Sequence, residues 1–185
     1  MALKATIFKS RLQITDMDRD YYQAHAITLA RHPSETDERM MVRLLAFVRH
    51  ASETLAFTRG LSTVEEPDLW QHGPAGDIEL WIDLGQPDEK RIRKACSQAR
   101  QVCIYCYSGH SATLWWERLG SRLGNLRNLT VINLPAPASQ ALAGLAQRNM
   151  QLQCTIQDGL LWLGDDERTV EVNPEIWQQA ARQSP

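Results

Sequence analysis

Residues 101–108 constrain the fold of this chain more than any other stretch. Between the polar residues at its two ends, the stretch is nearly continuously apolar: Val102, Cys103, Ile104, Tyr105, Cys106 and Tyr107. A strand that is apolar on both faces needs cover on both faces, which is typical of sheets packed between helices. Residues 129–134 are also mostly apolar and fit another buried strand. We therefore expect an α/β core in which helices cover a sheet that contains these strands.

Helical patterns alternate with the strands in the middle of the chain. An apolar stripe predicts a helix over residues 35–53, with Ser34 as its N-cap. Three more helices are expected, one that begins after Asp88 and two others over residues 111–123 and 138–148. Two more strands are expected over residues 55–60 and 78–85.

The two ends of the chain have patterns that are typical of hairpins. Residues 2–30 alternate in polarity around an acidic turn, although residues 21–30 also fit a short helix. Residues 152–163 alternate around Asp158-Gly159. Residues 169–172 fit an edge strand. The predicted fold class is α/β, with a mixed central sheet flanked by helices and extra β-hairpins at both ends.

Composition narrows the class of protein. The 185 residues fit a single domain over 1–185, and the formal net charge is −2. Coating of duplex nucleic acid usually needs a strong positive excess, so nucleic acid remains a possible partner only through a local basic patch. The start of the chain lacks a secretory signal pattern, and no apolar run approaches the roughly 18 residues of a membrane span. The four cysteines lie in segments predicted to be buried, so we expect reduced thiols and a cytoplasmic location. The sequence does not indicate whether the protein has a protein partner.

Three acidic residues form the strongest candidate for chemistry. Glu79 and Asp83 share one face of the strand predicted over residues 78–85, and Asp68 comes from a neighbouring segment. Such carboxylates could bind Mg²⁺, which prefers oxygen ligands and can activate water for phosphodiester cleavage. The alternative is that Glu79 and Asp83 simply line a solvent-facing sheet surface.

Five segments of the chain resemble the YaeQ family of bacterial proteins. They are Ala30-Arg31-His32-Pro33-Ser34-Glu35-Thr36, Glu38-Arg39-Met40-Met41, Phe57-Thr58-Arg59-Gly60-Leu61, Trp81-Ile82-Asp83-Leu84-Gly85-Gln86-Pro87-Asp88 and Thr155-Ile156-Gln157-Asp158-Gly159. The resemblance implies a variant of the PD-(D/E)XK nuclease core, like that of restriction endonucleases, and does not by itself imply a defined activity.

The resemblance also nominates site residues. Pro67-Asp68 would be the Pro-Asp element and Asp83 the second acid, but Gly85 stands where the motif has its Lys. Some relatives in that superfamily carry the Lys on the following helix, which nominates Lys94, with Gln98 one turn further on. Glu38 matches a carboxylate that is often found in the first helix.

Helical geometry argues against Lys94 in this role. If Ile92, Ala95 and Ala99 face the core, Lys94 lies nearly opposite them, while Arg91 and Gln98 lie on a flank. The cations between Lys90 and Arg100 could contact phosphate, although charge runs usually form solvated faces.

Two further motifs, a CxxC spacing and a pair of tryptophans, are explained more simply by packing than by function. Cys103-Ile104-Tyr105-Cys106 has CxxC spacing, but it lies in a buried strand without a second ligand pair, so core packing is favoured over zinc. Trp115 and Trp116 cannot both face the core, so one is expected near a groove, where it could stack a base or cap an edge.

Two functions remain open from the sequence. The first is a metal-dependent nuclease-like enzyme that uses Asp68, Glu79 and Asp83 with Mg²⁺, and Lys94 as the cation. The second is a catalytically degenerate binding or adaptor protein on the same scaffold, which the missing Lys and the acidic net charge favour.

Overall fold

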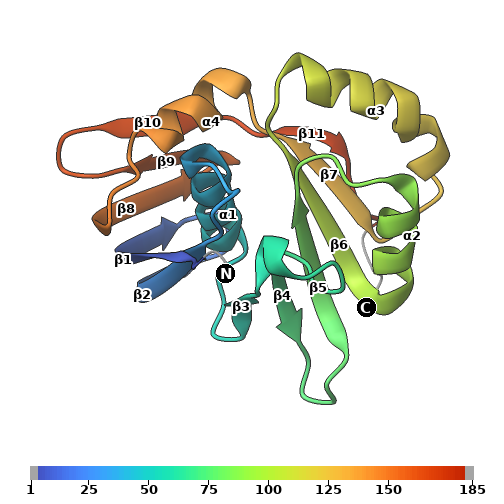
Figure 1. Ribbon diagram of the computed structural model, residues 1–185, viewed down its shortest axis with the longest axis horizontal. Coiled ribbons are helices and arrows are strands. Elements are labelled where there is room, and N and C mark those ends of the chain that lie inside the picture. The colour runs from blue at the N-terminus through green and yellow to red at the C-terminus, as the bar shows by residue number, and fades with distance from the viewer. Residues whose placement is uncertain (1–3, 182–185) are drawn as a thin grey trace.

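The computed structural model describes residues 4–181, which fold into two mixed β-sheets and four α-helices (Figure 1). The first sheet has five strands, in the spatial order β10 (Thr169–Val172), β9 (Leu160–Gly164), β8 (Asn149–Gln157), β1 (Thr6–Asp16) and β2 (Tyr21–Arg31). The second has six, in the order β11 (Glu175–Gln178), β7 (Leu129–Asn133), β6 (Ala99–Cys106), β5 (Ile78–Leu84), β4 (Leu69–His72) and β3 (Leu55–Phe57). The helices are α1 (Asp37–His50), α2 (Glu89–Gln98), α3 (His110–Leu123) and α4 (Ala136–Ala143), and a short 3-10 turn, η1, covers Gly60–Ser62.

The α/β class is confirmed, and the structure has two mixed sheets where one central sheet with extra hairpins is predicted. Both terminal hairpins form as expected, but β1 pairs with β8 in parallel, so the hairpins join each other and build a sheet of their own. The predicted beginning of the first hairpin at residues 2 and 3 lies outside the described residues. Short-range polarity patterns identify strands but contain no signal for this pairing between opposite ends of the chain.

Helix α1 lies between the two sheets and forms the centre of the main core (Figure 1). Every residue from Met40 to Val48 is buried, because apolar strands face the helix from both sides. Its N-cap is Thr36, whose hydroxyl accepts a hydrogen bond from the Arg39 amide at 3.1 Å, and not Ser34 as predicted. Ser34 instead bonds the His32 ring in the preceding turn.

Helices α2 and α3 cover the other face of the six-stranded sheet (Figure 1). Trp81 and Asp83 on β5 are therefore buried beneath them, at 3% and 2% exposure. The alternative that Glu79 and Asp83 line a solvent-facing sheet surface is thus wrong for Asp83. Two short strands, β4 and β11, were not predicted, because residues 69–72 lie in a turn-rich segment and residues 175–178 are too short for a clear pattern.

Other features of the helices and strands follow the sequence closely. Asp88 caps α2 by accepting a hydrogen bond from the Arg91 amide at 2.8 Å. The β8–β9 turn has positive φ at both Asp158 and Gly159, which matches the left-handed geometry that this residue pair favours. Over residues 4–181, we find no helix with the length and apolar character that crossing a membrane requires.

Candidate functional site

The antiparallel pairing of β4 with β5 positions two of the predicted acids. Leu69 lies opposite Ile82, so Asp68, just before β4, lies beside the end of β5 that carries Asp83. The Asp68 amide donates to the Ile82 carbonyl at 2.9 Å, and the Leu84 amide donates to Asp68 Oδ2 at 2.9 Å. Local backbone pairing therefore holds both carboxylates at the same end of the six-stranded sheet.

Asp68 is bound by an arginine from α1. Its Oδ1 accepts a hydrogen bond from Arg39 Nη2 at 2.8 Å, and the carboxylate is almost fully buried. Arg39 also pairs with Glu35 at 3.0 Å, and Glu35 pairs with Arg43 at 2.9 Å. Burial alone would lower the pKa of Arg39, but the Asp68 and Glu35 carboxylates raise it above its ordinary value. The four groups form a row of alternating charges that is neutral overall.

Asp83 is bound by an arginine from α2. Arg91 Nε and Nη2 donate to the two carboxylate oxygens at 2.8 and 2.9 Å, which is the bidentate geometry of a strong ion pair. The same guanidinium donates to the carbonyls of Val64 and Glu66, at 2.6 and 3.0 Å. The hydrogen bonds to Asp83 raise the pKa of Arg91. Arg91 therefore fixes the loop before β4 against the carboxylate.

Both ion pairs line one pocket of about 350 Å³, which we call the Asp68–Asp83 pocket. Its walls also include parts of the loop between η1 and Pro67, and the turn after β5. Gly85 lies in that turn with φ +92°, a conformation that side-chain-bearing residues rarely adopt. The lysine that the motif would have at this position is therefore disfavoured by the backbone itself.

The side chains around the Asp68–Asp83 pocket do not fit a divalent cation as they are arranged. Every oxygen of the two carboxylates already accepts a hydrogen bond, and the guanidinium groups of Arg39 and Arg91 neutralise the two acids and place positive charge where a metal would bind. Within residues 4–181, no group of three or more His, Cys, Asp or Glu side chains has the spacing of a metal site. The pocket as arranged therefore does not offer Mg²⁺ a binding site.

Comparison with known proteins identifies the family. A sequence model of the family described as YaeQ protein matches residues 1–174. The chain belongs to the YaeQ family. It is 48% identical to the YaeQ protein of Escherichia coli strain K12 over 179 residues, which cover 97% of this chain and 99% of that protein.

Two solved YaeQ structures have the same fold. The crystal structure of YaeQ from Xanthomonas axonopodis pv. citri has a TM-score of 0.92 and 48% identity, with 96% of this chain and 99% of that chain covered. The crystal structure of YaeQ from Pseudomonas syringae has a TM-score of 0.90 and 34% identity, covering 95% of this chain and 97% of that one. The fold is thus shared with these two YaeQ proteins.

The other four predicted site residues lie away from the Asp68–Asp83 pocket of this YaeQ chain. Glu79 accepts a hydrogen bond from Gln71 at 3.2 Å, and Glu38 accepts one from the Ser139 hydroxyl of α4 at 2.6 Å. Lys94 pairs with the exposed Glu65 at 2.6 Å. Gln98 is exposed at the end of α2. None of the four lines the pocket.

The basic segment around α2 is largely neutralised by carboxylates. Arg93 pairs with Glu89 and Arg100 pairs with Asp77, at 2.9 and 2.8 Å, in addition to the pairs of Arg91 and Lys94. Such pairing removes most of the positive potential that contact with a phosphate backbone would need. The CxxC cysteines, Cys103 and Cys106, are buried within β6, as core packing predicts.

The tryptophan pair of α3 is also accounted for by packing. Trp115 is buried, as expected for one member of the pair. Trp116 stacks on Trp177, with ring centroids 6.0 Å apart and an angle of 19° between the rings. One face of the Trp116 ring is therefore already covered, so stacking of a base is not supported there.

Sequence reasoning missed the arginines that hold the two acids. Arg43 gives the clearest signal, because it interrupts an otherwise apolar stretch of α1 and so needs a buried counter-ion. Arg39 lies four residues after Glu35, a spacing that brings side chains together on a helix. Helical geometry places Arg91 on the flank of α2, but sequence spacing does not identify its partner on β5.

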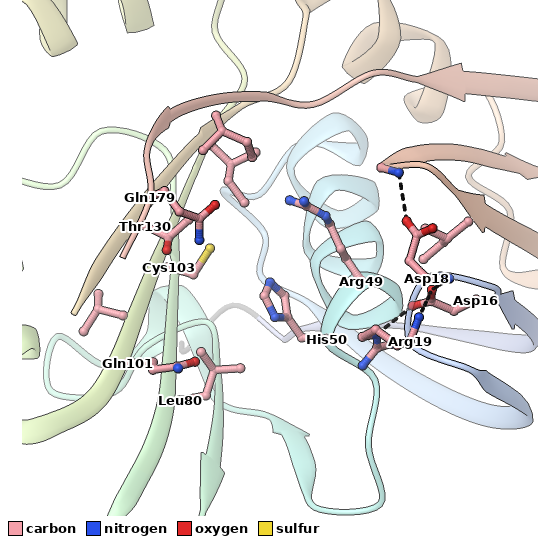
Figure 2. A pocket seen from close by; sticks show the side chains of 15 residues that line it. Asp16, Asp18, Arg19, Arg49, His50, Leu80, Gln101, Cys103, Thr130 and Gln179 are labelled. Carbon is pink, nitrogen blue, oxygen red and sulfur yellow. Dashed lines mark hydrogen bonds and ion pairs between the residues drawn. The ribbon is translucent and has the colours of Figure 1, made fainter. Parts of the chain in front are cut away.

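A second pocket, which we call the inter-sheet pocket, lies between the two sheets at the C-terminal end of α1 (Figure 2). Its volume is about 290 Å³. Arg49 and His50 reach it from α1, while Gln101, Cys103 and Thr130 line it from the six-stranded sheet. His50 Nε2 lies 2.8 Å from the Tyr105 hydroxyl, and burial lowers the pKa of His50 to about 3. Nothing in the sequence pattern signalled this pocket.

Proposed function

We propose that this YaeQ-family chain is a binding protein without metal-dependent turnover, built on a scaffold related to the PD-(D/E)XK nuclease core. One observation carries the proposal: Asp68 and Asp83, the two acids that the nuclease motif assigns to the metal, are each bound by an arginine. The four free cysteines, three of them buried, support a reducing cytoplasmic compartment as part of the same proposal.

Displacement of the two arginines by a metal would be costly. Asp68 is 5% exposed and Asp83 is 2% exposed, and the side chains of Arg39 and Arg91 are 14% and 28% exposed. A largely buried charge that loses its partner destabilises a protein by about 3–5 kcal/mol. A divalent cation at this site would therefore have to offset the loss of two such pairs.

The competing function is metal-dependent cleavage of nucleic acid, which one observation favours. Asp68 and Asp83 come from different strands and line the same pocket, as paired metal ligands would. Catalysis would then require Arg39 and Arg91 to move aside when a metal binds. The two functions differ in whether divalent cations bring about cleavage that depends on these acids.

A cleavage assay separates the two functions. The purified protein is incubated with single-stranded DNA, duplex DNA and RNA in Mg²⁺ or Mn²⁺, beside the variant Asp83→Asn. We expect the wild type to cleave no faster than Asp83→Asn, because the acid is held by Arg91.

The matched control is Asp77→Asn, which removes a partly exposed carboxylate from its pair with Arg100. Metal-dependent cleavage that persists in Asp77→Asn but disappears in Asp83→Asn would contradict the proposal. Cleavage that persists equally in all three proteins would come from a contaminating nuclease.

A further inference from the structure

The inter-sheet pocket contains a cation, Arg49, that forms no ion pair among the described residues. Burial lowers the pKa of Arg49, but the nearby Tyr105 side chain and, more weakly, the Asp16 carboxylate raise it above the ordinary value. Within residues 4–181, no carboxylate lies within ion-pairing distance of Arg49, and its buried Nη1 has no hydrogen-bond partner. Figure 2 shows the guanidinium projecting from α1 toward the side chains of the six-stranded sheet. An arginine remains protonated at any ordinary pH, so this pocket contains a permanent positive charge.

The other charged groups around the pocket are each held by partners other than Arg49. Arg19 forms an ion pair with Asp16 at 2.6 Å. Asp18 accepts hydrogen bonds from the amides of Asp158 and Gly159, at 2.7 and 2.8 Å.

The titratable groups nearest Arg49 on α1 and β6 carry no charge. Burial raises the pKa of Cys103 to about 12 and raises that of Tyr105 well above its ordinary value, so both remain protonated. His50 is neutral because burial lowers its pKa. None of these groups can neutralise Arg49.

A partly buried charge with a buried, unpartnered nitrogen is unfavourable, which means that a bound anion paired to that nitrogen would stabilise this arrangement. We propose that the inter-sheet pocket binds a small organic anion, with a carboxylate or phosphate group of the ligand paired to Arg49. This inference goes beyond the proposed function and does not depend on the Asp68–Asp83 pocket.

The residues that line the inter-sheet pocket indicate the chemistry of the rest of the ligand. The Thr130 hydroxyl and the amides of Gln101 and Gln179 offer hydrogen bonds, while Leu80 and Ile132 offer apolar contacts. A volume of about 290 Å³ lies at the lower limit of small-molecule sites, which span about 300–1,000 Å³. The ligand is therefore expected to be a compact metabolite-sized acid with both polar and apolar parts.

Isothermal titration calorimetry tests this inference with defined probes. Citrate and succinate represent carboxylates, glycerol 3-phosphate represents an organic phosphate, and glycerol is the uncharged comparison. We expect at least one anion to bind the wild type, and Arg49→Gln to weaken that binding at least tenfold. Arg49→Lys keeps the charge but loses the bidentate geometry, so its affinity should fall between the two.

The control is Arg11→Gln, which removes an exposed arginine of β1 that does not line this pocket. Thermal unfolding without ligand provides a second measurement, in which Arg49→Gln should be at least as stable as the wild type because it removes a partly buried charge with an unpartnered nitrogen.

Three outcomes would overturn the inference. The first is that none of the anions binds the wild type more tightly than glycerol does, and the second is that Arg49→Gln binds as well as the wild type. A large loss of stability in Arg49→Gln without ligand would also overturn it, because it would show that Arg49 already has a structural partner. None of these outcomes bears on the cleavage assay, so the two proposals fail separately.

Discussion

At the residue scale, one glutamate pairs with two arginines inside the core. Glu35 pairs with Arg39 and with Arg43, and Arg43 is only 2% exposed. Glu35→Gln would leave Arg43 buried without a carboxylate, so we expect the free energy of unfolding to fall by about 3–5 kcal/mol. Urea denaturation measures this change.

The matched control for Glu35→Gln is Asp37→Asn, which breaks the more exposed pair with Arg31. A surface pair of this kind contributes at most about 1 kcal/mol, so the control should unfold close to the wild type. Equal stabilities for the two variants would show that the charges on α1 are balanced by groups other than Glu35.

At the scale of helices and strands, α1 is joined to β6 by the hydrogen bond between His50 and Tyr105. Burial, with smaller contributions from Arg49 and Arg19, lowers the folded-state pKa of His50 to about 3, below the ordinary value of 6.5. The unfolded chain therefore binds a proton more readily, and His50 causes stability to fall as the pH drops from about 6.5 toward 3. Above pH 6.5 this contribution is constant.

The variant His50→Gln tests that contribution, because glutamine can still bond the Tyr105 hydroxyl but does not titrate. We expect its free energy of unfolding to depend less steeply on pH than that of the wild type between pH 6.5 and 4, in urea titrations. His110→Gln, which changes an exposed histidine at the start of α3, should keep the wild-type slope. If His50→Gln also keeps that slope, the pKa of His50 is the same in the folded and unfolded protein, and burial does not lower it.

At the scale of the whole molecule, the helices and most strands could be predicted, but their division into two sheets could not. The apolar runs at β6 and β7 identify buried strands from local pattern alone. The parallel pairing of β1 with β8 depends on contacts between opposite ends of the chain, for which local periodicity contains no signal. The candidate site shows the same limit. The resemblance to the YaeQ family nominated Asp68 and Asp83, while their partners Arg39 and Arg91 come from helices whose packing only the fold defines.

The central claim is that arginines, and not a metal, hold the two acids of the Asp68–Asp83 pocket. The most direct measurement is anomalous X-ray scattering from crystals of the protein soaked in Mn²⁺. The account predicts no manganese peak between the two carboxylates, with the Arg39–Asp68 and Arg91–Asp83 pairs still in place. A manganese ion bound by both carboxylates, with either guanidinium displaced, would contradict it.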